Sequence, residues 1–221
     1  MEPYLIAGVV FLGVAVVVTV ALLAHKAEKR RTEQIAQIAA EMGFSFDAAG
    51  SITSAAAGNL PVFGKGHSKK SKNVMRKVVR GSEVTLLDYQ YTIGSGKNRH
   101  TVKMTVAVFF AQEGQSFPSF EMQPEAIWHK IGSYFGYQDI DFESHPVFSS
   151  AYLLRGTDEP AIRAAFTPEV LDFLEKAPMK WCVETRSNRM AIFRQSRVKP
   201  EHLKEFLADA TRLFLLFIVP G

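Results

Sequence analysis

The sequence has little cysteine and lacks the short motifs of well-known catalytic sites. Cys182 is the one cysteine in 221 residues, which excludes an intrachain disulfide and a cysteine-based metal cluster and suits a reducing compartment. No Walker loop, Gly-x-Gly-x-x-Gly, Gly-x-Ser-x-Gly, His-Glu-x-x-His or calcium loop occurs. We therefore expect no cofactor and favour a non-catalytic role over an enzyme.

Charge is also missing from the start of the chain. Residues 4–24 carry no charged side chain and are rich in Val, Leu, Ala and Ile. As a helix this run is about 31 Å long, which matches the hydrocarbon core of a bilayer. A cleaved signal peptide is the alternative, but it would have positive charge before a shorter apolar run. We expect residues 4–24 to form a retained transmembrane helix after a short extracytoplasmic N-terminus, residues 1–3.

The basic residues beside this run predict its orientation. No Lys or Arg precedes it, whereas Lys26, Lys29, Arg30 and Arg31 follow it closely. The positive-inside rule then places the N-terminus outside and the rest of the chain in the cytoplasm. The expected location is the cell membrane, as a single-pass protein.

The membrane helix is expected to continue as a juxtamembrane helix over residues 25–43. No Pro or Gly occurs from Lys26 to Met42, and Ile35, Ile38, Ala39 and Met42 recur at helical spacing before Gly43. This apolar face is expected to pack on the core of the domain that follows. A coiled-coil contact in a homodimer is the alternative, although the face is short for a heptad pattern.

Residues 44–221 have the composition of one folded domain. The whole chain is 47% hydrophobic and 22% charged, which is close to the globular average. Period-two and period-3.6 patterns alternate along it, so the predicted fold class is α+β, a mainly antiparallel sheet covered by helices. The predicted strands are 44–46, 60–63, 73–79, 84–93, 100–111, 117–122, 146–154, 181–185 and 190–194, and the predicted helices are 124–135, 159–176 and 199–219.

Some local signals refine these elements. Residues 48–59 and 64–72 are interpreted as loops, the second of them basic. Pro118 suggests that its strand lies at a sheet edge. Thr157 or Asp158 is expected to cap the helix over 159–176, and Pro124 to begin the helix over 124–135.

One short segment could bind a divalent cation. If residues 138–146 are extended, alternation places Asp139, Asp141, Glu143 and His145 on one face. Carboxylates with an imidazole are ligands for such cations. The alternative, which we favour, is a solvated strand face whose other side is core.

A second candidate surface is basic. Lys65, His67, Lys69, Lys70 and Lys72 occur with no acidic residue before Glu83. Near a membrane such charges attract anionic lipid, while nucleic acid is disfavoured because aromatic residues do not alternate with them. A solvated loop is the alternative. The candidate lipid-contact residues are Lys26, Lys29, Arg30, Arg31, Lys65, Lys69, Lys70 and Lys72.

Two further residues could carry chemistry but are interpreted as structural. Cys182 has no His nearby in its predicted hairpin to act as a base. His129 follows Trp128 in a predicted short helix and has no evident partner.

Parts of the domain resemble a family. Residues 86–92, 101–110 and 117–125 look like a group of uncharacterised bacterial proteins with one N-terminal membrane helix and a cytoplasmic domain. The resemblance implies a bacterial inner-membrane setting and supplies no activity.

Together these features predict a membrane-anchored binding or scaffold module. Its partner would be a membrane or cytoplasmic protein, anionic lipid headgroups or a small ligand. The alternative is an enzyme at the membrane surface, metal-dependent if residues 139–145 bind a cation. An enzyme should show a deep pocket with converging polar groups, whereas a binding module should show an exposed apolar patch or a free strand edge.

Overall fold

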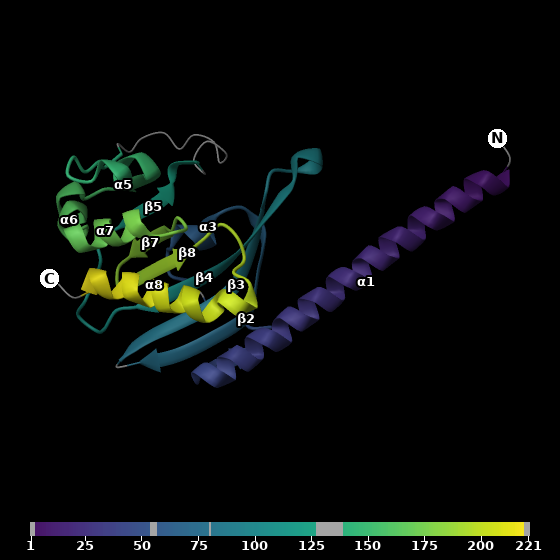
Figure 1. The fold of residues 1–221 in the computed structure, drawn as a ribbon, viewed down its shortest axis with the longest axis horizontal. Helices are drawn as coiled ribbons and strands as arrows, with labels where there is room; N and C mark the ends of the chain where they lie inside the picture. Colours follow the sequence, from purple (N-terminus) through teal and green to yellow (C-terminus); the bar gives the residue numbers. More distant parts are fainter. Residues whose placement is uncertain (1–2, 54–56, 80, 127–138, 219–221) are drawn as a thin grey trace.

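The long apolar helix at the N-terminus is followed by an α+β domain, which confirms the predicted fold class (Figure 1). The computed structural model describes residues 3–53, 57–79, 81–126 and 139–218. The described strands form an eight-stranded sheet in the order β1-β2-β3-β4-β8-β7-β5-β6, and every neighbouring pair is antiparallel.

Helix α1 runs unbroken from Pro3 to Met42, as the lack of Pro and Gly after Lys26 predicts. From Phe11 onward it is long and apolar enough to cross a membrane. Its side chains in this part face no protein core: Phe11 is 77% exposed and Leu23 is 62% exposed. Only its last turns enter the domain, where Ile35 and Ala39 are buried.

The strands differ greatly in length. The three long central strands contain 11 to 13 residues each, and the others contain three to five. Their bounds are β1 Ser45–Asp47, β2 His67–Val79, β3 Ser82–Ile93, β4 His100–Phe110, β5 Phe120–Pro124, β6 Tyr152–Gly156, β7 Cys182–Arg186 and β8 Arg189–Phe193. As a result β2, β3 and β4 extend beyond the rest of the sheet as a long ribbon (Figure 1).

The two faces of the sheet carry separate apolar cores. The larger core lies under α8 and the end of α1, and also under the helices α5 to α7. The smaller core lies under α3 and includes Tyr89, Tyr91 and Cys182. The bounds of these helices are α3 Pro61–Gly64, α5 Pro146–Ala151, α6 Glu159–Ala165, α7 Pro168–Lys176 and α8 Leu203–Ile218, with 3-10 turns η1 Gly96–Asn98 and η2 Pro200–His202.

Two predictions near the start of the domain are wrong. Residues 60–63 were expected as a strand but enter helix α3, because Pro61 at its first position favours a helix start. Residues 64–72 were expected as a loop, but β2 begins at His67 and pairs with the aromatic-rich β3. That cross-strand pairing outweighs the weak strand propensity of Lys and Ser. Two register shifts, beside Ser68 and Asn73 with φ of 51° and 53°, accommodate the irregular sequence.

Prolines explain three further differences. Pro146 starts helix α5, so only Tyr152 onward forms the strand expected over 146–154. Pro168 divides the helix expected over 159–176 into α6 and α7, although Asp158 caps α6 as predicted by accepting the Ala161 N–H. Strand β5 lies between β7 and β6 rather than at an edge, because Pro118 precedes it.

Other local predictions are confirmed. The hairpins β3–β4 and β7–β8 match residues 84–111 and 181–194 closely. Helix α8 buries the apolar face expected for residues 199–219. The expected helix over 124–135 falls mostly outside the described residues, and Pro124 itself ends β5.

Candidate functional site

A buried ion pair joins α1 to the sheet. Arg31 donates from Nε and Nη2 to the two carboxylate oxygens of Asp88, each at 2.7 Å, and from Nη1 to the Val198 carbonyl at 2.8 Å. The Arg31 and Asp88 side chains are only 12% and 2% exposed. A bidentate pair that is shielded from water fixes both the position and the angle of the Arg31 guanidinium relative to Asp88. Helix α1 is therefore attached firmly to the sheet at this point.

The Asp88 carboxylate has further donors. Asn73 Nδ2 and Thr105 Oγ1 each donate to it at 3.0 Å, from the strands on either side. Thr105 Oγ1 in turn accepts the Val198 N–H at 3.0 Å. The charge of Asp88 is therefore paired and hydrogen-bonded, as a buried charge requires.

Glu28 makes a second contact between α1 and the domain. It accepts from Lys72 of β2 at 2.6 Å and forms an ion pair with Arg197. Burial alone would raise the pKa of Glu28, but the hydrogen bonds from Lys72 and Arg197 outweigh it and lower the pKa to about 2.

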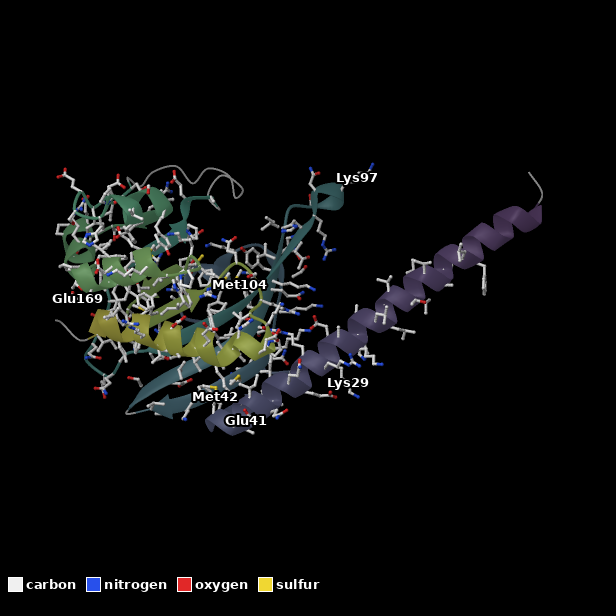
Figure 2. All side chains as sticks on the ribbon, viewed as in Figure 1. Lys29, Glu41, Met42, Lys97, Met104 and Glu169 are labelled. Carbon is white, nitrogen blue, oxygen red and sulfur yellow. The ribbon has the colours of Figure 1, made fainter. Side chains whose placement is uncertain are left out.

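Two lysines attach the C-terminal end of α1 to the domain. Lys77 of β2 donates to the Met42 carbonyl at 2.7 Å and lies over the Phe44 ring. Lys204 of α8 donates to Glu41 at 2.6 Å. Figure 2 shows Glu41 and Met42 at the end of α1 that meets the domain, with Lys29 further along the helix.

Beside this end of α1 lies an apolar groove of about 630 Å³ between α1, the β2–β3 hairpin, β4 and α8. Its floor is made by buried side chains, among which Phe109 and Phe214 stack with ring centroids 4.7 Å apart. The residues that line it are Met42, Phe44, Lys77, Val79, Ser82, Glu83, Val84, Phe109, Gln112, Gln115, Lys204, Leu207, Ala208, Thr211, Phe214, Leu215 and Ile218.

The groove is lined mainly by apolar side chains. Val79 and Leu215 on its walls are each 48% exposed, although large apolar side chains are costly to leave in water. Its charged lining residues are Lys77, Glu83 and Lys204, and both lysines are paired. The groove is therefore an exposed and mainly apolar surface.

A buried carboxylate on the opposite face has a structural role. Glu184 is fully buried and accepts the Val62 N–H at 2.6 Å and a hydrogen bond from Lys65 Nζ at 3.0 Å. Burial raises the pKa of Glu184, against the opposing attraction of Lys65. Since Val62 belongs to α3, this carboxylate holds α3 on the sheet.

Cys182 lies in the same apolar core and is fully buried. Burial raises the pKa of its thiol, so little thiolate forms at neutral pH. This agrees with the structural role expected for it, while His129 lies outside the described residues.

The carboxylates considered for a cation do not share one strand face, because residues 139–145 are not a strand. Asp139 accepts the Leu154 N–H at 2.8 Å, and His145 Nε2 lies 3.5 Å from Asp172. Asp141 and Glu143 are exposed. Within the described part of the chain, no three His, Cys, Asp or Glu side chains are grouped to hold a metal ion.

The candidate lipid-contact residues divide into two groups. Arg31, Lys65 and Lys72 are held in ion pairs with Asp88, Glu184 and Glu28. The remaining candidates are exposed, and they are Lys26, Lys29, Arg30, Lys69 and Lys70.

Sequence reasoning missed Asp88, Glu184 and the groove. A signal existed for Asp88, since it is the one acidic residue between Glu83 and Glu113 and lies within an apolar strand. No comparable signal exists for the groove, because its walls come from elements far apart in the sequence.

No family model and no curated protein matches the chain. The fold is similar to the crystal structure of the mycobacterial trehalose monomycolate transport factor A, TtfA. The TM-score is 0.60 at 14% sequence identity, over 88% of this chain and 98% of that one. At this identity the likeness shows the fold, and the resemblance to a bacterial membrane-protein family stays a prediction.

Proposed function

We propose that the chain is a membrane-tethered binding module whose groove takes the apolar face of a helix from a partner protein. In this proposal α1 crosses the bilayer with its N-terminus outside and holds the sheet domain in the cytoplasm. The observation that carries it is the groove, an exposed apolar surface on a well-packed domain, at the end of a helix long and apolar enough to cross a membrane.

The position of the groove favours a protein over a lipid that remains in the bilayer. Along α1, the distance from Ala24 to Met42 is about 27 Å at about 1.5 Å per residue. The groove beside Met42 therefore stands well above the membrane surface when α1 leaves the bilayer upright.

The charges at the groove also favour a protein helix. Lys204 is paired with Glu41 and Lys77 with the Met42 carbonyl, so an anionic headgroup would compete with existing partners. An amphipathic helix needs only apolar contacts from side chains three or four positions apart. The similar fold of TtfA, a transport factor, is compatible with a binding role at a membrane.

The test compares variants of exposed apolar residues in the full-length protein, purified in mild detergent. A photo-crosslinking amino acid at Leu215 should join the chain to a partner protein, identified by mass spectrometry. Val79→Asp and Leu215→Asp should reduce co-purification of that partner at least about tenfold, because a buried carboxylate is costly. Val147→Asp is the matched control, since Val147 is an exposed apolar residue on α5, at 57%, and does not line the groove.

Equal co-purification by all four proteins would overturn the proposed role of the groove. A second contrary result is a lipid, found by organic extraction, that is lost from Val79→Asp and Leu215→Asp while no protein crosslinks to Leu215. The groove would then hold an acyl chain instead of a helix.

A further inference from the structure

Strand β2 and helix α1 lie along one another in a known direction. Lys77 of β2 contacts Met42, and Lys72 contacts Glu28. Passing from Lys77 to Lys72 along β2 therefore corresponds to passing toward the N-terminus of α1. The start of β2, at His67, lies further in that direction and pairs with Thr92 near the β3–β4 turn.

The β3–β4 hairpin is long enough to reach the level at which α1 would enter a bilayer. From the Arg31–Asp88 contact, α1 covers about 10 Å back to Ala24, at about 1.5 Å per residue. From the same contact, β3 covers about 17 Å to Ile93, at about 3.4 Å per residue. The turn after Ile93 extends this end further, and Figure 1 shows the hairpin projecting on the side of the apolar half of α1.

This end of the sheet is strongly basic. No acidic residue occurs between Asp88 and Glu113, nor between Lys65 and Glu83. Lys97 lies at the end of the hairpin in Figure 2. We define the basic tip by its exposed cationic and imidazole side chains, which are His67, Lys69, Lys70, Lys97, Arg99, His100 and Lys103.

We propose that the basic tip lies on the anionic lipid headgroups of the same bilayer that α1 crosses. This inference rests on the membrane span in the proposed function and not on the groove. The tip carries positive charge, which anionic lipid attracts. The hairpin is long enough to bring this charge close to the headgroups, where salt does not yet screen the attraction. Lys26, Lys29 and Arg30 on α1 add a contact at the point of entry.

Contact with the bilayer through both α1 and the basic tip would fix the orientation of the domain. A single helix leaves the domain free to rotate about the helix axis. The basic tip removes that freedom, because α1 is attached to β2 and β3 by Arg31 and Glu28. The groove beside Met42 then lies at the end of α1 that is further from the bilayer, where a cytoplasmic partner has access.

A fluorescent label on the tip tests the contact. Ser95→Cys in the full-length protein supplies an exposed thiol at the turn, whereas the native Cys182 is buried. The labelled protein is reconstituted in phosphatidylcholine vesicles with and without phosphatidylglycerol, and headgroup nitroxide lipid is the quencher. Quenching should be at least about twofold stronger with phosphatidylglycerol and should weaken in high salt.

Charge reversal gives the matched comparison. Lys97→Glu with Arg99→Glu should remove the dependence on phosphatidylglycerol, while Lys176→Glu with Lys180→Glu, on and after α7, should leave it unchanged. A label at Glu113→Cys, beyond the opposite end of β4, should stay unquenched in both vesicles.

Flotation of the full chain with vesicles tests the span separately. If the chain floats but the Ser95 label is not quenched, or is quenched equally in both vesicles, the contact proposed for the tip is overturned and the span stands. If the chain does not float with either vesicle, the span fails and the inference about the tip fails with it.

Discussion

At the scale of single residues, Asp88 shows that the energetic contribution of an ion pair depends on its burial. Its pair with Arg31 has two short hydrogen bonds and is almost fully shielded from water. The Lys29–Glu33 pair, by contrast, is exposed with its charged atoms 4.0 Å apart. Exposed pairs contribute about 0–1 kcal/mol, whereas removing one partner of a buried pair leaves an uncompensated charge.

Asp88→Ala should therefore lower the free energy of unfolding by about 3–5 kcal/mol, because Arg31 would lose its carboxylate partner. Denaturant unfolding of the full chain in detergent measures this change. Arg31→Met combined with Asp88→Leu should be less destabilising than Asp88→Ala alone, since no charge is left unpaired. Glu33→Ala is the control and should change the value by less than about 0.5 kcal/mol. A loss below about 1 kcal/mol for Asp88→Ala would show that water reaches Arg31.

At the scale of elements, helix α8 serves both the core and the groove. One face, with Leu203, Phe206 and Ala210, is buried against the sheet. Phe214 stacks on Phe109 in the core and also forms part of the floor of the groove, whereas the next residue, Leu215, is half exposed. Adjacent positions of α8 therefore have different roles.

Phe214→Ala should lower the free energy of unfolding by about 3–5 kcal/mol, because it removes a buried ring and leaves a cavity. Leu215→Ala should change it by less than about 0.5 kcal/mol, since the side chain is largely outside the core. Thermal and denaturant unfolding of the two proteins measures the difference. Similar losses for both variants would contradict the packing seen here.

The broken elements show why proline positions matter more than apolar periodicity. The pattern over 159–176 is helical throughout, yet Pro168 starts a new helix because it fits the first turn better than the interior. The same reason makes Pro61 and Pro146 begin helices where apolar runs suggested strands.

At the scale of the whole molecule, α1 has two differently placed parts. From Phe11 to Leu23, α1 exposes apolar side chains, and its last turns are packed on the domain. The contacts of Arg31, Glu28 and Met42 attach α1 rigidly to the domain, so the two are not joined by a flexible linker. In the proposed function, the direction in which α1 crosses the bilayer therefore decides which compartment contains the groove.

The proposed orientation predicts which thiols a membrane-impermeant maleimide labels in cells. A cysteine in a tag placed before Met1 should react in intact cells, because the N-terminus is outside. Glu113→Cys, in an exposed position far from the basic tip, should react only after the membrane is permeabilised. Labelling of Glu113→Cys in intact cells would reverse the proposed orientation.

The sequence by itself determined the features that depend on neighbouring residues. The apolar run, the continuous α1 helix and the β3–β4 and β7–β8 hairpins follow from local periodicity and turn residues. The amphipathic face of α8 also follows from spacing along one helix.

Only the tertiary structure decided which polar groups are buried and with what partners. Arg31 forms an ion pair with Asp88, which is 57 positions away in the sequence, and Lys65 forms one with Glu184, which is 119 positions away. Both cations were candidates for lipid contact, but the fold places them against carboxylates that need compensation in a core. The groove was decided in the same way, because its walls converge only when α1, the β2–β3 hairpin and α8 pack together. Local sequence patterns carry no information on contacts between residues far apart in the sequence. Burial depends on those contacts, because it arises only when the chain packs.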